Sequence, residues 1–111
     1  MPRPRLQRLV RFMPKVNYFK PAGIPMRNLK EIRLTVEELE AIRLKEAESM
    51  TQENASKKMN VSRVTFQRTL KSAHRKIAEA LTKGKALRIE GGSFVLKTEN
   101  NKNRLRGRMN G

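Results

Sequence analysis

The chain has 111 residues, with 26 Lys or Arg against 10 acidic residues, a formal net charge of +16. This length suits one domain. The absence of cysteine excludes a disulfide framework and thiolate metal sites, and a single histidine, His74, leaves no partner for a histidine-based metal or catalytic site. No segment is apolar enough for a membrane span or a signal peptide. We therefore expect a cytoplasmic protein that is no enzyme, holds no cofactor or metal, and binds a polyanion that offsets its charge.

Residues 1–28 contain all five prolines. Proline fixes φ and lacks an N–H donor, so this stretch cannot form a long helix. It nevertheless holds too many apolar residues for a free tail. We expect an extended arm that lies on the core, with a short strand near Leu9–Phe12, and a second short strand at Ile32–Leu34.

A helix is predicted after Thr35, because Thr35 and Glu38 have the spacing of a capping box. Apolar residues then recur at nearly helical spacing. Residues 35–50 carry five glutamates against two basic residues, so this helix is expected to face away from an anionic partner. A cap, helix-dipole partners and a solvated face explain these acids better than a metal cluster; they are Glu37, Glu38, Glu40, Glu46 and Glu48.

Two further helices are predicted. The first has Thr51 as its N-cap and runs to Met59, where Asn60 suits a left-handed residue. The second is capped by Ser62 and runs to about Lys83, stopping at Gly84. Its apolar residues fall on one stripe, namely Phe66, Leu70, Ala73, Ile77 and Leu81. The opposite face carries Val64, Arg68, Lys71 and Arg75.

Residues 86–90 and 93–97 favour β structure and are separated by Gly91-Gly92, which is typical of a hairpin with a two-residue turn. Residues 98–111 are rich in Asn, Lys, Arg and Gly, and we expect them to form a disordered basic tail. The predicted fold is mainly α. One domain over 1–97 comprises a three-helix helix-turn-helix core (the motif at about 51–83), an extended N-terminal arm and a small C-terminal β-hairpin.

The segment from Gln52 to Leu70 fits a helix-turn-helix. Small residues stand where the two helices would touch, Asn60 suits the turn, and apolar residues line the inner face of the second helix. The start of that helix would enter the major groove of DNA, with base-reading candidates Ser62, Arg63, Val64, Gln67 and Arg68. Phosphate contacts are expected from basic residues around it and on the arm, which are Arg3, Arg5, Lys57, Lys58, Lys71 and Arg75. Arg8 and Arg11 would extend the basic arm.

Several motifs resemble those of uncharacterised protein family 0251. They include Pro2-Arg3-Pro4-Arg5, Phe12-Met13-Pro14, the run Tyr18-Phe19-Lys20-Pro21-Ala22-Gly23-Ile24-Pro25, Val61-Ser62-Arg63 with Thr65-Phe66, and the run from Gly84 to Gly92. The resemblance covers residues 2 to about 92. It implies a DNA-binding, regulatory protein whose helix-turn-helix is similar to that in the promoter-reading last domain of sigma factors. Relatives often carry cysteine near Gln7 and Val10, where this chain has none, so no metal or redox role follows there.

The function expected from the sequence is sequence-specific binding of double-stranded DNA by a nucleoid-associated transcriptional regulator. An RNA-binding or ribosome-associated protein is the main alternative, because small size and high positive charge suit ribosomal RNA equally well. The same helices could instead form a structural αα-hairpin with a solvated basic face. An adaptor that binds RNA polymerase is a weaker alternative. The sequence is also compatible with a homodimer.

Overall fold

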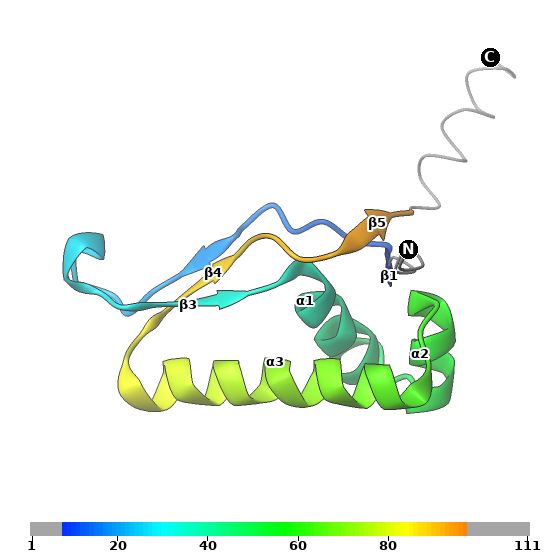
Figure 1. Ribbon diagram of the computed structural model, residues 1–111. Helices are drawn as coiled ribbons and strands as arrows, with labels where there is room; N and C mark the ends of the chain where they lie inside the picture. The colour runs from blue at the N-terminus through cyan, green and yellow to red at the C-terminus, as the bar shows by residue number, and fades with distance from the viewer. Residues whose placement is uncertain (1–7, 98–111) are drawn as a thin grey trace, which may run out of the picture.

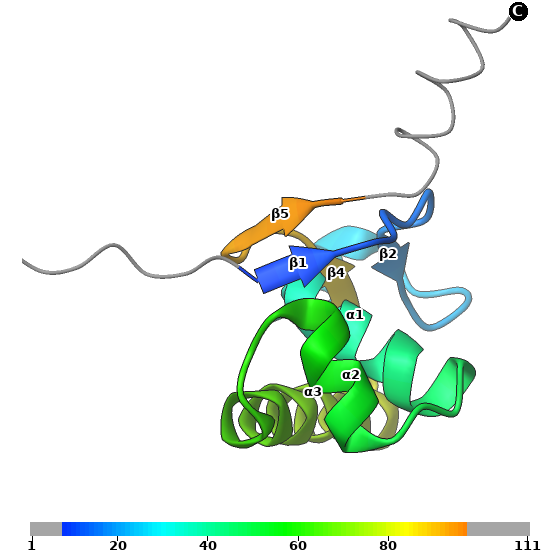
Figure 2. The same cartoon turned by 90° about the vertical axis from the view of Figure 1, so that its right-hand side faces the viewer.

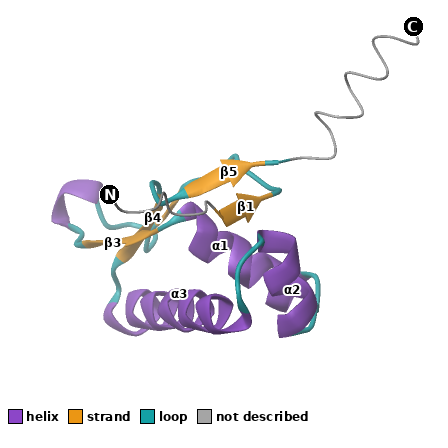
Figure 3. Cartoon of the chain, turned by 45° about the vertical axis from the view of Figure 1, so that its right-hand side comes forward, coloured by secondary structure: helices purple, strands orange, loops and turns teal. Residues whose placement is uncertain are grey.

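The computed structural model describes residues 8–97 of the chain. The molecule has a layer of helices beneath a layer of short strands (Figure 1, Figure 3). The predicted phosphate contacts Arg3 and Arg5, and the predicted tail over 98–111, lie outside the described residues.

The helices begin and end at the residues that local chemistry predicts. They are α1 (Val36–Ile42), which continues into a π-helical turn η2 (Arg43–Ala47), α2 (Gln52–Met59) and α3 (Arg63–Lys83). The capping box of α1 is present, with the Thr35 and Glu38 side chains each bonded to the other's backbone N–H. The side chain of Thr51 caps α2 in the same way that Ser62 caps α3. Left-handed Asn60 and Gly84 end these two helices, as expected from the sequence.

Five short strands form two small sheets. They are β1 (Arg8–Val10), β2 (Tyr18–Phe19), β3 (Glu31–Leu34), β4 (Ala86–Ile89) and β5 (Phe94–Leu96), and a 3-10 turn η1 (Met26–Asn28) lies between β2 and β3. Central β4 pairs antiparallel with β2 and parallel with β3, while β1 and β5 form a separate parallel pair. The predicted strands near residue 9, before Thr35 and after Gly84 are therefore present.

The predicted pairing of the two C-terminal strands is wrong. β4 and β5 belong to different sheets, so they do not form a hairpin with one another. Gly91-Gly92 instead carries the chain from one sheet to the other over the start of α1. At Gly92, φ is +108°, and a Cβ there would overlap the Glu37 carboxylate. Gly92 therefore packs closely against Glu37, which is distant in sequence. The rule that two glycines between strands form a hairpin turn considers only neighbouring residues and could not predict this contact.

The core consists of two adjoining clusters. One joins α1, η2, α2 and the first half of α3 through Ala41, Leu44, Ala55, Met59, Phe66 and Leu70. The other joins the strands to α1 and the middle of α3 through Val10, Leu34, Val36, Ala73 and Ile89. Val10 is fully buried in the second cluster, so the described part of the arm contacts the core at β1, whereas Phe12, Met13 and Val16 after it are exposed.

Two further expectations are corrected. Leu81 was placed on the apolar stripe of α3 but is 77% exposed, because the core ends one residue earlier, at buried Ala80. The predicted solvated acidic face of α1 is wrong for Glu40, which is 1% exposed, while Glu38 forms the predicted capping box and is also buried, at 7%. Both carboxylates are satisfied by cations and N–H donors, which is the condition for burying a charge.

Candidate nucleic-acid interface

A tight connection joins α2 to α3. Asn60 has φ 59° and ψ 45°, and the following Val61 N–H donates to the Ser56 carbonyl at 3.0 Å. Ser62 Oγ then accepts the Thr65 N–H at 3.1 Å and begins α3. Small buried Ala55 and Ser56 let the two helices approach each other. Viewed along α3, helix α2 crosses in front of it and β1 and β5 lie above (Figure 2).

The solvent face of α3 is basic along its first four turns. Five residues predicted to contact DNA from this helix are exposed, namely Arg63, Val64, Gln67, Arg68 and Lys71, and Arg75 is exposed one turn further on. No acidic residue occurs in α3 before Glu79. Within residues 8–97, the four cations of this face form no ion pair with a carboxylate. Their charge is therefore available to an external anion.

The side chain of Gln67 is held by α2. Its Nε2 donates to Gln52 Oε1 at 2.8 Å. Gln52 was not singled out in the sequence, because a contact fifteen residues away leaves no periodic signal. The bond orients the Gln67 amide while leaving its carbonyl oxygen and second N–H exposed. Such an amide can pair with both edge groups of an adenine. By contrast, the hydroxyl of Ser62 is already used to cap α3.

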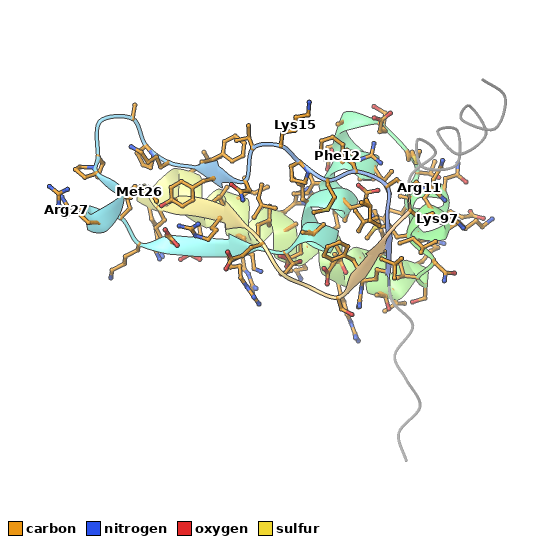
Figure 4. The ribbon with its side chains drawn as sticks, turned by 90° about the horizontal axis from the view of Figure 1, so that it is seen from above. Arg11, Phe12, Lys15, Met26, Arg27 and Lys97 are labelled. Carbon is orange, nitrogen blue, oxygen red and sulfur yellow. The ribbon has the colours of Figure 1, made fainter. Side chains whose placement is uncertain are left out.

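A basic hollow lies between the arm and α2. It has a volume of about 410 Å³ and is lined by Arg11, Met50, Asn54, Lys57 and Lys58. Lys57 meets Glu53 at 3.5 Å, but both side chains are exposed and such pairs contribute little. Arg11 and Lys97 lie toward the α2 end of the molecule, whereas Met26 and Arg27 mark the opposite end (Figure 4). Asn54 and Lys97 are further candidate contacts that the sequence did not indicate.

Buried Glu40 fixes the arm beside this hollow. Its carboxylate accepts the Arg11 backbone N–H at 2.9 Å and two hydrogen bonds from Arg43, at 2.9 and 3.0 Å. The hydrogen bond to Glu40 raises the pKa of Arg43 above its ordinary value and outweighs the effect of burial. The Arg43 guanidinium also lies over the Phe12 ring, 5.6 Å from its centre. These contacts set the direction in which the chain leaves β1.

Glu38 joins α1 to the middle of α3. Its carboxylate accepts hydrogen bonds from Lys76 Nζ at 2.7 Å and from Ser72 Oγ at 2.5 Å. Burial raises the pKa of Glu38, but the hydrogen bonds from Lys76, Ser72 and the Thr35 N–H together bring it below its ordinary value. Glu38 thus neutralises Lys76 where α3 packs on α1, while the exposed cations on the outer side of α3 form no such pair within residues 8–97.

The predicted DNA-contacting residues that lie within the described range occupy one region. Those of α3 share its solvent face, and Lys57 and Lys58 lie at the end of α2, beside the basic hollow. No group of three or more His, Cys, Asp or Glu that could hold a metal ion occurs among residues 8–97. In the same part of the chain, no helix is long and apolar enough to cross a membrane.

Within residues 8–97, three α-helices lie under two short sheets, and the chain is strongly basic. Residues 1–97 match the model of a family described as protein of unknown function DUF134. A UPF0251 protein of Halothermothrix orenii is 57% identical over 96 residues, which is 86% of this chain and 71% of that protein. A UPF0251 protein of Moorella thermoacetica is 56% identical over 96 residues, and the match covers 86% of this chain and 64% of that protein. UPF0251 protein TTE1845 of Caldanaerobacter subterraneus is 57% identical over 94 residues, covering 85% and 80% of the two chains.

The chain therefore belongs to this uncharacterised family, and the resemblance found in its sequence motifs is confirmed. No solved structure matches the chain.

Proposed function

We propose that the protein binds double-stranded DNA in a sequence-specific way and regulates transcription, with α2 and α3 acting as a helix-turn-helix. The first half of α3 enters the major groove. The observation that carries the proposal is the exposed face formed by Arg63, Arg68, Lys71 and Arg75, none of which forms an ion pair with a carboxylate within residues 8–97. The protein acts by binding and not by catalysis.

The base-reading groups are Arg63, Val64, Gln67 and Arg68. An arginine can pair with both acceptors of a guanine, and Val64, which is 57% exposed, can meet a thymine methyl. The amide of Gln67, oriented by Gln52, can pair with adenine. Ser62 contributes by capping α3 through the Thr65 N–H, and the N–H groups of Arg63 and Val64 at the start of the helix are the ones that face a phosphate.

The phosphate contacts come from both sides of the reading helix. The phosphates of one DNA strand contact the residues around the basic hollow, which are Asn54, Lys57, Lys58 and Arg11 of the arm. Lys71 and Arg75, further along α3, receive the other strand. Contacts of this kind add affinity for every sequence, because the backbone charge is the same everywhere. A duplex also presents a major groove wide enough for a helix, whereas the deep major groove of A-form RNA is too narrow.

The proposal is tested by selecting duplexes from a random DNA pool with the full chain. A preferred sequence should emerge, and Arg68→Ala should weaken it by about 1–3 kcal/mol while changing the affinity for random duplexes much less. Lys71→Ala is the matched control, because it removes a cation from the same helix face and should weaken both duplexes alike.

Two results would contradict the proposal. One is a selection that returns no preferred duplex. The other is structured RNA that competes better than the selected DNA, which would favour the RNA-binding alternative.

A further inference from the structure

A second hollow lies at the far end of α3, away from the proposed DNA-binding face. It has a volume of about 340 Å³ and is lined by Phe19, Lys20, Pro21, Ala80, Leu81, Gly84, Lys85 and Leu87. Its lining residues belong to the end of α3, the residues that follow it, β2 with the residues after it, and β4; Figure 1 shows the end of α3 below these strands. The α3 rise of about 1.5 Å per residue puts Leu81 roughly 28 Å from Ser62. One bound molecule could therefore occupy the hollow while another contacts the start of α3.

The lining of this hollow is apolar and exposed. Leu81 is 77% exposed, the highest value among the large hydrophobic residues of the described chain, and Phe19 is 54% exposed. Single exposed apolar residues are ordinary, but these two flank one concave site whose floor includes Leu87 and Ala80. Its volume is near the lower end of the roughly 300–1,000 Å³ of typical binding pockets. The site is sized for one or two apolar side chains.

The charge around the hollow is positive. Lys20 and Lys85 line it, and no carboxylate does. Lys20 Nζ donates to the carbonyl oxygens of Pro21 and Ile24, at 3.4 and 2.8 Å, so its charge is not neutralised there. Lys85 is paired with Glu79 at 2.6 Å, so the excess positive charge here comes from Lys20 and from exposed Lys83 in the last turn of α3, next to Gly84 of the lining. These lysines also offset the negative end of the α3 dipole. A partner that fits this rim carries negative charge.

The basic face of α3 does not reach this end. Beyond Arg75 the helix continues with Ala78, Glu79 and Thr82, so no cation follows Arg75 and Lys76 until Lys83 in the last turn. The two ends of the helix therefore differ in chemistry. The start of α3 fits a nucleic acid, which offers phosphates and polar base edges. The end of α3 fits a ligand that has an apolar group with acidic groups around it.

We propose that this hollow docks an acidic peptide segment of another protein, which inserts a Leu-like or Phe-like side chain beside Leu81 and Phe19. Its carboxylates lie near Lys20, the lysine of the lining that is not paired with Glu79. A second copy of this chain fits less well, because a symmetric contact would bring the same lysines of two +16 molecules together. The site would let a DNA-bound molecule hold a second protein. The inference does not depend on the DNA proposal.

The test uses a displayed library of random 12-residue peptides selected on the full chain, with removal of peptides that also bind the Leu81→Ser variant. The expected peptides carry a large apolar residue flanked by Asp or Glu. The affinity of a synthetic copy should fall roughly 10- to 100-fold with Leu81→Ser, which is the value of burying one such side chain. Val64→Ser is the matched control, because it removes an exposed apolar residue from the other end of α3 and should leave peptide binding unchanged.

A second peptide separates docking from simple charge attraction. It keeps the acidic residues but replaces the apolar residue with serine, and it should bind weakly and equally to the wild type and Leu81→Ser. The inference is overturned if no Leu81-dependent peptide is recovered or if the recovered peptides lack acids. It is also overturned if sedimentation shows a dimer that Leu81→Ser dissociates, since a second copy would then fill the hollow. Leu81→Ser should leave duplex affinity unchanged, so failure here is distinct from failure of the DNA proposal.

Discussion

The Glu40 carboxylate accepts a hydrogen bond from the backbone N–H of Arg11 at 2.9 Å, which joins α1 to the N-terminal arm across 29 positions of sequence. The same carboxylate holds Arg43 through two bonds. A buried acid in a strongly basic protein thus has a positional role. It determines where the arm runs relative to α2 and the basic hollow.

Glu40→Gln should lower the free energy of unfolding by about 1–3 kcal/mol, because it removes the buried counter-charge of Arg43 and leaves only the exposed Glu48 beside the guanidinium. Denaturant unfolding measures the change. Glu48→Gln is the control, since Glu48 meets the same Arg43 from an exposed position at 3.3 Å. That variant should change stability by less than about 0.5 kcal/mol. Equal effects of the two substitutions would contradict the role given to Glu40.

The three-stranded sheet carries an ion pair of its own, and its contribution to stability depends on pH in the acid range. Arg88 binds both oxygens of Glu31 at 2.9 Å and lies 4.5 Å from the centre of the Tyr18 ring, whose hydroxyl also donates to Glu31. These hydrogen bonds, with that from Arg88 the strongest, lower the pKa of Glu31 to about 2. Because the folded-state pKa is lowered, the stabilisation is complete above the ordinary value of 4.5 and is lost as the pH falls towards 2.

Glu31→Gln should therefore lower the melting temperature at neutral pH, and its difference from the wild type should shrink between pH 4.5 and 2. In an Arg88→Gln background the same substitution should have little further effect. A difference that stays constant across this pH range would show that the Glu31 charge does not stabilise the fold.

Gly92 is required by its neighbour Glu37. A Cβ at Gly92 would overlap the Glu37 carboxylate, and φ is +108°, so Gly92→Ala should destabilise the protein by about 1–3 kcal/mol. Gly23→Ala is the control. Its φ of +81° is also unfavourable for alanine, but nothing lies within 4 Å, so only the backbone cost of roughly 1–2 kcal/mol applies. Thermal unfolding that ranks Gly23→Ala as the more harmful change would contradict this assignment.

The exposed cations of α3 should make the affinity for duplex DNA depend on the salt concentration. Each phosphate contact contributes about −0.9 to the slope of log K against log salt on duplex DNA, because counterions are released. Lys71→Ala and Arg75→Ala should each reduce that slope by about 1 for any duplex. Lys15→Ala removes an exposed cation of the arm far from α3 in sequence and serves as the reference variant. Slopes that are unchanged in all three variants would place the DNA elsewhere.

Local signals predicted the helices well. Thr35, Thr51 and Ser62 each accept a hydrogen bond from a backbone N–H three residues later, and Asn60 and Gly84 each adopt the left-handed conformation that ends a helix. These interactions span few residues, so the sequence contains all the information they need.

Contacts between distant residues were not predicted. β4 and β5 look like a hairpin because two glycines separate them, but pairing of β4 with β3 and of β5 with β1 depends on the packing of the whole core. Leu81 has the right phase for the apolar stripe and lies beyond the end of the core. Helical periodicity gives the direction of a side chain and not the extent of the surface that covers it.

The central claim is that the first half of α3 lies in the major groove. It is tested most directly by recording amide NMR spectra of isotope-labelled protein while the selected duplex is added. The proposal predicts the largest shifts for residues 62–68, smaller ones for Lys57 and Lys58, and little change for residues 84–89. Shifts concentrated on β2, β4 and the sheet face around Tyr18 and Arg88, with α3 unaffected, would contradict it.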